Sequence, residues 1–340
     1  MGWPPRRILA RGSHVCAWAQ GSEHDVCLLP ALARAAPLSS TIEFMNLSGV
    51  FAPIPTPMDD LARVDAARLG TGFEWWLRSG LAGFVVLGSS GEAPLLDDDE
   101  CDRFVEAMRD MVPRSRTFIV GTGRESTQAS VRAARRAAEL GADAVLVRTP
   151  ASFKAQMTTE AFARHYSTVA DSSPVPVLLY NFTSATGVDL APAVVSRLSE
   201  HPNVAGIKES NGDVARIAEL VSVTPGRFHV LAGSAATFFP ALSVGAVGGI
   251  LSLACVLPDA CVRLFELARR QQYDAARVLQ QQLMPLARLL GSQYGVPALK
   301  AGLKLAGCDV GFPRPPLMPL AEASVAVLRD ALAAFQEVAA

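Results

Sequence analysis

The sequence predicts a (β/α)8 TIM barrel, an α/β fold, with a C-terminal helical domain. The first observation is repetition: eight short runs of β-branched or apolar residues recur along the chain, and helical patterns follow them. Eight βα units are typical of a closed parallel barrel. The second is that no GxGxxG loop follows the first run, as a dinucleotide-binding doubly wound sheet would require. The third is length, because 340 residues hold one barrel and an appended domain.

The predicted strands share a high content of Val, Ile, Leu and Ala. They are Val50–Pro53, Gly83–Gly88, Thr117–Gly121, Ala144–Arg148, Val175–Tyr180, Val204–Lys208, His229–Ala232 and Val247–Leu251. Amphipathic segments lie between them: Asp65–Ser79, Asp98–Met111, Ser126–Leu140, Thr159–Ala170, Ala191–Ser199, Asp213–Val221 and Ala235–Val244. Apolar residues recur in these segments at helical spacing, as Val131, Ala134 and Ala138 do.

The chain divides into three predicted parts. Residues 46–258 form the catalytic barrel. Residues 259–340 form a helical domain, with helical patterns at Cys261–Arg270, Tyr273–Leu290, Pro297–Ala306 and Ala321–Val338. Residues 1–45 show little periodicity, and we interpret them as a disordered extension or as a start codon placed too early. A mitochondrial transit peptide is the alternative, because the first twenty residues are rich in Arg and lack acids, although Glu23 and Asp25 weaken it.

Composition and charge exclude several classes of protein. Half of the residues are hydrophobic, the net charge is −1, and no Lys/Arg-rich stripe is present, so we expect no nucleic-acid partner. His229–Pro258 contains no formally charged residue, but its glycines and Pro240 favour a strand-helix-strand unit over a membrane span. None of the six cysteines lies in a CxxC pair or in a Cys/His cluster, so we expect reduced thiols, no metal site and a cytoplasmic location.

Lys208 is the first candidate for catalysis. Active sites of this fold lie at the C-terminal ends of the strands, and Lys208 ends the apolar run Val204–Lys208. Burial in such a strand favours the neutral amine, which is the nucleophile that attacks a ketone to form a Schiff base. The alternative is that Lys208 only pairs with a carboxylate, such as Glu209 or Glu92.

Two further strand ends face the same mouth. Tyr180 ends the fifth predicted strand, where its phenol could transfer a proton; the alternative is a rim tyrosine without a catalytic role. The loop Gly88–Glu92 offers two hydroxyls and backbone amides that suit a carboxylate. A lysine, a tyrosine and this loop together indicate a site for a 2-oxo acid bound as an imine. Such a site needs no metal and no separate cofactor, because the protonated imine accepts the electrons.

These residues carry a resemblance to a known family. The motifs Gly88-Ser89-Ser90-Gly91-Glu92, Leu179-Tyr180-Asn181 with Thr186-Gly187, and Gly206-Ile207-Lys208-Glu209-Ser210 resemble those of the dihydrodipicolinate synthase/N-acetylneuraminate lyase family of pyruvate-dependent aldolases. The resemblance covers about residues 47–320. It implies that Lys208 forms the imine and that Tyr180 is the general acid/base. It also implies that Ser89 and Ser90 bind the pyruvate carboxylate, with Ser89 in the proton relay.

The same resemblance implies further site residues and an assembly. Gly233 and Ile250 would shape the pocket through backbone contacts, and Ser210 is the remaining candidate for substrate binding. Family members are usually tetramers built from tight dimers, so we expect a homotetramer. Within the family, the chain is most similar to the 4-hydroxy-2-oxoglutarate aldolase group, in stretches that include Glu125-Ser126-Thr127-Gln128-Ala129, His201-Pro202-Asn203 and Leu231-Ala232-Gly233-Ser234-Ala235.

The sequence departs from the family pattern at two places. Dihydrodipicolinate synthases carry an arginine for the second substrate's carboxylate in the loop after the tyrosine strand, and this sequence has Ala185 there. Many members also have a tyrosine after the Thr-Pro of strand four, where this sequence reads Ala151-Ser152-Phe153-Lys154. Ser152 or a water molecule would then replace the tyrosine, or the relay is shorter. Lys154 is either a contact for an acidic substrate or a solvated loop residue.

We therefore predict a lyase that cleaves a 2-oxo acid to pyruvate plus an aldehyde. The substrate would be 4-hydroxy-2-oxoglutarate, which releases glyoxylate, or a 2-keto-3-deoxy sugar acid. One alternative keeps the lysine imine but condenses substrates, as dihydrodipicolinate synthase does, or adds or removes water. Another is a pyruvate-binding relative without activity, because fold alone does not imply function.

Overall fold

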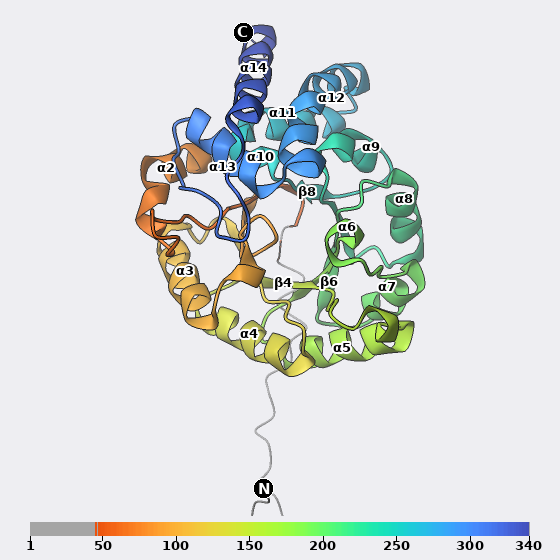
Figure 1. The fold of residues 1–340 in the computed structure, drawn as a ribbon. Coiled ribbons are helices and arrows are strands. Elements are labelled where there is room, and N and C mark those ends of the chain that lie inside the picture. The colour runs from red at the N-terminus through yellow and green to blue at the C-terminus, as the bar shows by residue number, and fades with distance from the viewer. Residues whose placement is uncertain (1–44, 46, 340) are drawn as a thin grey trace, which may run out of the picture. The chain divides into compact units, whose positions relative to one another are not determined.

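The strands of the protein close into a parallel barrel (Figure 1). The computed structural model describes residues 45 and 47–339. Each strand pairs with the next in the chain, and β8 pairs with β1. The strands are β1 (Gly49–Pro53), β2 (Gly83–Val86), β3 (Thr117–Gly121), β4 (Ala144–Arg148), β5 (Val177–Asn181), β6 (Val204–Glu209), β7 (His229–Ala232) and β8 (Gly248–Ile250). The predicted (β/α)8 barrel is confirmed.

Most predicted strand bounds agree with the structure to within two residues, and β3, β4 and β7 agree at both ends. The predicted second strand ran to Gly88, but β2 ends at Val86 because Leu87 has a positive φ of 54° and turns the chain out of the sheet. The predicted fifth strand began at Val175, but β5 begins at Val177, directly after Pro176, which has no N–H to donate.

Both faces of the barrel wall are buried, which explains the near-continuous apolar strands. The inward residues form one cluster that includes Phe51, Val85, Ile119, Leu146 and Leu178. The outward residues pack against the surrounding helices in a second, larger cluster. Side chains alternate between the two clusters along each strand, so every second residue near a strand's C-terminal end lies at the barrel mouth.

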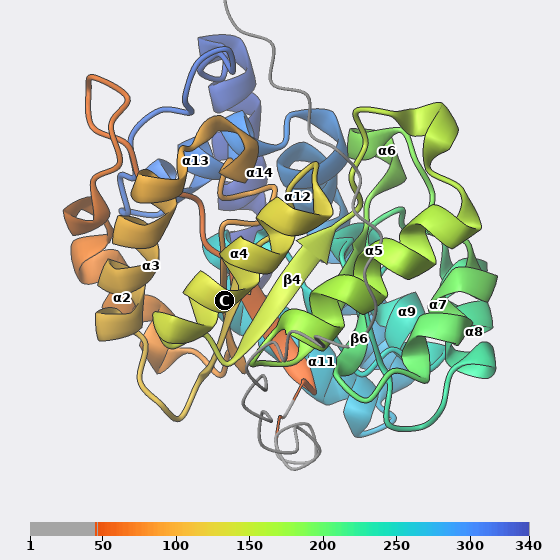
Figure 2. The ribbon, with the colours of Figure 1, turned by 90° about the horizontal axis from the view of Figure 1, so that it is seen from below.

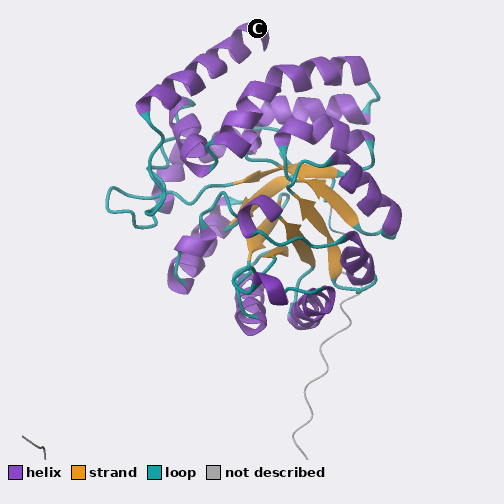
Figure 3. Ribbon diagram, turned by 45° about the vertical axis from the view of Figure 1, so that its right-hand side comes forward, coloured by secondary structure: helices purple, strands orange, loops and turns teal. Residues whose placement is uncertain are grey.

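Helices surround the strands (Figures 1 and 3). The helices up to β8 are α2 (Gly70–Arg78), α3 (Asp98–Met111), α4 (Thr127–Glu139), α5 (Thr159–Ser172), α6 (Thr183–Thr186), α7 (Pro192–Ser199), α8 (Val214–Val223) and α9 (Phe238–Ser243). A capping box between Asp97 and Glu100 fixes the start of α3, which has the predicted bounds. Figure 2 shows α4 and α5 along the outside of β4, and these two helices are in contact.

Further helices follow β8: α10 (Leu253–Val256), α11 (Pro258–Arg269), α12 (Tyr273–Arg288), α13 (Val296–Leu305) and α14 (Glu322–Ala339). Helix α11 contacts β1 and α9, so it takes the eighth helical position of the barrel although it begins at the predicted boundary, residue 258. Helix α14 packs on α12 and α13. The described residues belong to one compact unit.

Two findings concern the whole described part of the chain. None of its helices is long and apolar enough to cross a membrane. The uncharged stretch His229–Pro258 instead forms β7, α9, β8 and α10, as the strand-helix-strand interpretation predicted. The interpretation of residues 1–45 as an extension or a transit peptide falls, apart from Met45, outside the described residues.

Candidate active site

Lys208 and Tyr180 face each other inside the barrel. Strands β5 and β6 pair in a register that places Tyr180 opposite Lys208. Both residues are buried, with 3% and 5% of their surface exposed for Tyr180 and Lys208. The Nζ atom of Lys208 lies 4.4 Å from the centroid of the Tyr180 ring, within cation–π distance. The two residues that the sequence singled out are therefore neighbours.

Neither carboxylate that was considered as a partner of Lys208 is available to it. Glu209 follows Lys208 in β6 and points to the opposite face, where its Oε2 accepts a hydrogen bond of 2.8 Å from Nε of Arg216. Glu92 forms an ion pair of 2.7 Å with Lys300. Within the described part of the chain, Lys208 forms no ion pair. The amine is thus buried without the partner that a purely structural lysine needs.

The loop after β2 places a hydroxyl on the tyrosine. The Oγ atom of Ser89 lies 3.1 Å from Oη of Tyr180, a distance at which either group can donate. The loop is a tight turn, in which the N–H groups of Gly91 and Glu92 donate to the carbonyls of Gly88 and Ser89. The loop therefore offers a carboxylate the side chains of Ser89 and Ser90 rather than these two amides.

Three contacts hold this loop from behind. The hydroxyl of Thr56 donates to the carbonyl of Gly91 at 2.6 Å. Lys300, from α13, reaches Glu92 at 2.7 Å, and the N–H of Arg314 donates to the same carboxylate at 2.6 Å. Burial lowers the pKa of Lys300 and the charge of Glu92 opposes this shift. The C-terminal helices thereby fix the position of a loop that belongs to the site.

The remaining predicted site residues lie around this centre. Ser90 is partly buried in the same turn as Ser89. Ile250 belongs to the barrel-interior cluster that contains Tyr180. Ser210 and Gly233 are in contact, because a Cβ atom on Gly233 would lie 1.9 Å from Oγ of Ser210. That hydroxyl is buried and has no hydrogen-bond partner in the described part of the chain, so it is available to a bound molecule.

A cavity of about 230 Å³ opens beside Tyr180. Its lining includes Ser89, Tyr180, Arg124, Glu125 and Arg148. Lys208 does not line it, whereas Tyr180, whose ring centroid lies 4.4 Å from the Lys208 amine, does. Neither Arg124 nor Arg148 was among the residues predicted for the site. The alternation along β4 could have identified Arg148, because Ala144 and Leu146 face the barrel interior and Arg148 is the next residue in that series.

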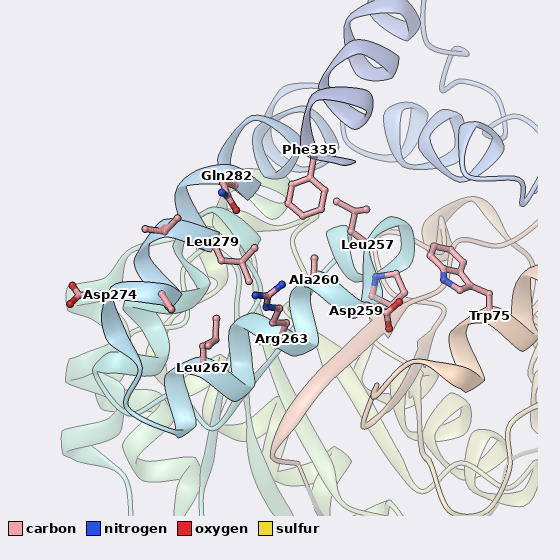
Figure 4. Close-up of a pocket in the computed structure, with 13 residues that line it drawn as sticks. Trp75, Leu257, Asp259, Ala260, Arg263, Leu267, Asp274, Leu279, Gln282 and Phe335 are labelled. Atoms are coloured by element: carbon pink, nitrogen blue, oxygen red, sulfur yellow. The ribbon is translucent and has the colours of Figure 1, made fainter. Parts of the chain in front are cut away.

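A larger cavity, of about 810 Å³, lies elsewhere (Figure 4). Helices α11 and α12 form most of it, with Trp75 and Phe335 at its border. None of the predicted site residues lines it, and its charged groups, Asp259, Arg263 and Asp274, come from α11 and α12. Two of the predicted site residues, Ser89 and Tyr180, line the smaller cavity instead.

The two departures from the family pattern occupy distinct places. Ala185 is exposed on the short helix α6 and brings no charge to the site. Ser152 donates its N–H to Glu125 at 2.8 Å and does not line the cavity. Lys154 is exposed and does not line it either. Tyr180 instead has the hydroxyl of Ser89 within hydrogen-bond distance, at 3.1 Å.

Comparisons with known proteins agree on one family. The model of the dihydrodipicolinate synthetase family matches residues 46–335. The chain is 33% identical to a 4-hydroxy-tetrahydrodipicolinate synthase of an Exiguobacterium species, over 86% of this chain and 99% of that protein. It is 37% identical to the enzyme of that name from Xanthomonas campestris pv. campestris, over 82% and 91% of the two chains.

Solved structures give the same result. The structure of a chloride-inhibited dihydrodipicolinate synthase from Acinetobacter baumannii, complexed with pyruvate, matches with a TM-score of 0.81 and 31% identity. The match covers 86% of this chain and 99% of that one. In the described part of the present chain, no group of three His, Cys, Asp or Glu side chains is arranged to hold a metal ion.

Proposed function

The chain belongs to the dihydrodipicolinate synthetase family, and we propose that it is a Schiff-base aldolase that cleaves a 2-oxo acid to pyruvate and an aldehyde. The observation that carries the proposal is the arrangement of three groups: a buried lysine with no ion-pair partner among the described residues, a tyrosine beside it, and a serine hydroxyl 3.1 Å from the tyrosine. These are a nucleophile, a proton-transfer group and a second member of a proton relay.

In this mechanism the neutral amine of Lys208 attacks the C2 carbonyl of the substrate. The carbinolamine takes up a proton through Tyr180 and loses water, which leaves a protonated imine. Tyr180, now the phenolate, accepts the proton of the C4 hydroxyl while the C3–C4 bond breaks. The electron pair of that bond moves into the imine and forms an enamine, and the aldehyde departs. Protonation of the enamine at C3 and hydrolysis then release pyruvate and regenerate Lys208.

Ser89 has two roles in this proposal. Its hydroxyl hydrogen-bonds Tyr180, so it can stabilise the phenolate or pass the proton onward. Together with Ser90 it binds the carboxylate next to the reacting carbonyl. The support of the loop by Thr56 and Lys300 keeps both hydroxyls in place while the imine forms.

The proposed substrate is 4-hydroxy-2-oxoglutarate or a 2-keto-3-deoxy sugar acid. The sequence stretches shared with the 4-hydroxy-2-oxoglutarate aldolase group favour the first. The second candidate function is condensation, which the names of the relatives favour, because these are 4-hydroxy-tetrahydrodipicolinate synthases. Ala185 opposes it, since the arginine that would hold the second substrate is absent. A hydratase or dehydratase would use the same imine without breaking a carbon–carbon bond.

A panel of assays with the purified protein tests this proposal. Pyruvate release is measured from 4-hydroxy-2-oxoglutarate and from a 2-keto-3-deoxy sugar acid, and formation of 4-hydroxy-tetrahydrodipicolinate is measured in parallel. We expect cleavage of one 2-oxo acid to exceed the condensing activity by at least about tenfold in kcat/KM, with no cleavage by Lys208→Ala. Condensation without cleavage would favour the second function, and loss of water without pyruvate release would favour a dehydratase.

We further propose that the protein is a homotetramer, as its family resemblance implies. Phe153, which is 72% exposed in the loop after β4, is an apolar group that such an assembly could cover. Light scattering coupled to size-exclusion chromatography measures the mass directly. A mass of one or two chains at micromolar concentration would contradict a tetramer.

A further inference from the structure

Arg148 is a cation of the barrel interior. It is the last residue of β4, and it follows Ala144 and Leu146, which both face inward. Strand pairing places it opposite Tyr180, as Lys208 is on the other side of β5. Tyr180 is thus flanked in the sheet by two basic residues. The proposed mechanism uses Lys208 to form the imine, but it contains no step that uses Arg148.

Arg124 brings a second guanidinium to the same cavity. It lies in the loop after β3 and lines the cavity together with Arg148. Its N–H donates to the hydroxyl of Ser130 at 2.9 Å, and its Nη2 lies 3.1 Å from Asp98. Both arginine side chains are about one quarter exposed, at 23% for Arg124 and 24% for Arg148. They are therefore partly desolvated and still reachable from the cavity.

One acidic group, Glu125, shares the lining of the cavity with the two arginines. Its Oε2 accepts the N–H groups of Ala151 and Ser152, at 2.9 and 2.8 Å. Burial acts to raise the pKa of Glu125, yet these N–H groups and Arg148 together hold it below its usual range. The other oxygen of Glu125, Oε1, lies 3.4 Å from Nη2 of Arg148. Asp98 is 87% exposed and lies outside the lining, so the lining keeps an excess of one positive charge.

The position of the cavity indicates which part of a substrate it would hold. Lys208 does not line it, whereas Tyr180 and Ser89 do. A substrate bonded to Lys208 at C2 and to Tyr180 at its C4 hydroxyl would extend its remaining carbons past Tyr180. Those carbons would enter the space beside the two arginines.

We propose that Arg148, assisted by Arg124, binds a carboxylate at the far end of the substrate, so that the enzyme prefers dicarboxylic 2-oxo acids. This inference rests on the proposed function, because it assumes the imine at Lys208. It also accounts for Ala185: the charge that the family places in the loop after β5 is supplied here from β4 and from the loop after β3. An arginine fork suits a carboxylate because it can donate two parallel hydrogen bonds.

Borohydride trapping of two 2-oxo acids that differ only at the far end tests the proposal. 2-Oxoglutarate carries a carboxylate where 2-oxopentanoate carries a methyl group, and neither needs to be cleaved to form an imine. For the wild type we expect half-saturation of adduct formation at a concentration about 10- to 100-fold lower for 2-oxoglutarate. Arg148→Gln should remove most of this preference, Arg148→Lys should restore part of it, and the exposed control Arg78→Gln should leave it intact.

Pyruvate, which has no far end, separates the outcomes. Its half-saturation should be the same in wild type and Arg148→Gln. A higher value in the variant would mean that Arg148 holds the carboxylate next to the imine, which overturns the proposal. Equal half-saturation concentrations for 2-oxoglutarate and 2-oxopentanoate in the wild type would also overturn the proposal. If pyruvate still formed an adduct in that case, the proposed function would not be affected. Failure of the wild type to trap pyruvate would refute the proposed function and this inference with it.

Discussion

Replacing Lys300 by methionine should destabilise the protein strongly, although the residue lies outside the barrel. Lys300 and Glu92 form an ion pair of 2.7 Å in which the side chains are 1% and 0% exposed. Removing one member leaves the other charge buried without its counter-ion. The cost of that in proteins is about 3–5 kcal/mol, which is a large part of the free energy of unfolding of a typical domain.

The same helix offers a matched control. Lys304 of α13 pairs with Asp309 at 2.9 Å, but these side chains are 59% and 48% exposed. Lys304→Met should therefore lower the free energy of unfolding by no more than about 1 kcal/mol. The double variant Glu92→Gln with Lys300→Met should recover part of the loss, because the amide carries no charge and can still accept the N–H of Arg314.

Equilibrium urea unfolding, followed by circular dichroism and by tryptophan fluorescence, measures these differences. Because Glu92 ends the loop that carries Ser89, Lys300→Met should also raise the half-saturation concentration of pyruvate in borohydride trapping. If Lys300→Met unfolds at the same urea concentration as Lys304→Met, the buried pair does not stabilise the protein. The account of how the loop is held in place would then be wrong.

Three more predictions follow from the site and its surroundings. Tyr180→Phe should lower kcat for cleavage about 10²- to 10⁴-fold while pyruvate is still trapped on the lysine; steady-state kinetics with trapping measure both, and an unchanged kcat would contradict the acid/base role. Burial, opposed only in part by Glu125, lowers the pKa of His165 to about 4 from 6.5. The folded state thus favours the neutral ring, and stability that is present above pH 6.5 should be lost as the pH falls towards 4, by up to about 3 kcal/mol. Urea unfolding should show a flatter profile in this window for His165→Gln, and an unchanged slope would contradict the assignment. Gly233→Ala should weaken pyruvate trapping, because the new Cβ atom would lie 1.9 Å from Oγ of Ser210; wild-type half-saturation would show that Gly233 does not shape the site.

The fold could be predicted because each strand is a short apolar run that a glycine or a polar turn delimits. Lys208 and Tyr180 could be selected because each ends such a run, and strand ends meet at one rim of a barrel. Both inferences use local sequence only. The exceptions are local as well: a positive φ at Leu87 ends β2 early, and Pro176 delays the start of β5.

The contacts that the sequence could not reveal depend on how distant segments meet. Glu92 and Lys300 lie in different parts of the chain, and no periodicity links the loop after β2 to α13. The sequence predicted that Arg148 ends a strand. Its position opposite Tyr180 depends on the register between β4 and β5, which the sequence does not show. The choice of Glu209 as a possible partner of Lys208 failed because adjacent strand residues point to opposite faces.

Borohydride trapping with pyruvate on Lys208 is the most direct test of the central claim. Wild type and Lys208→Ala are incubated with pyruvate and sodium borohydride, and intact mass and peptide mapping locate the adduct. We predict a pyruvate-sized adduct on Lys208 in the wild type and none in the variant. A folded wild-type protein that acquires no adduct would contradict the Schiff-base mechanism, and an adduct on another lysine would contradict the role of Lys208. The first of these results would favour a binding protein without catalytic activity.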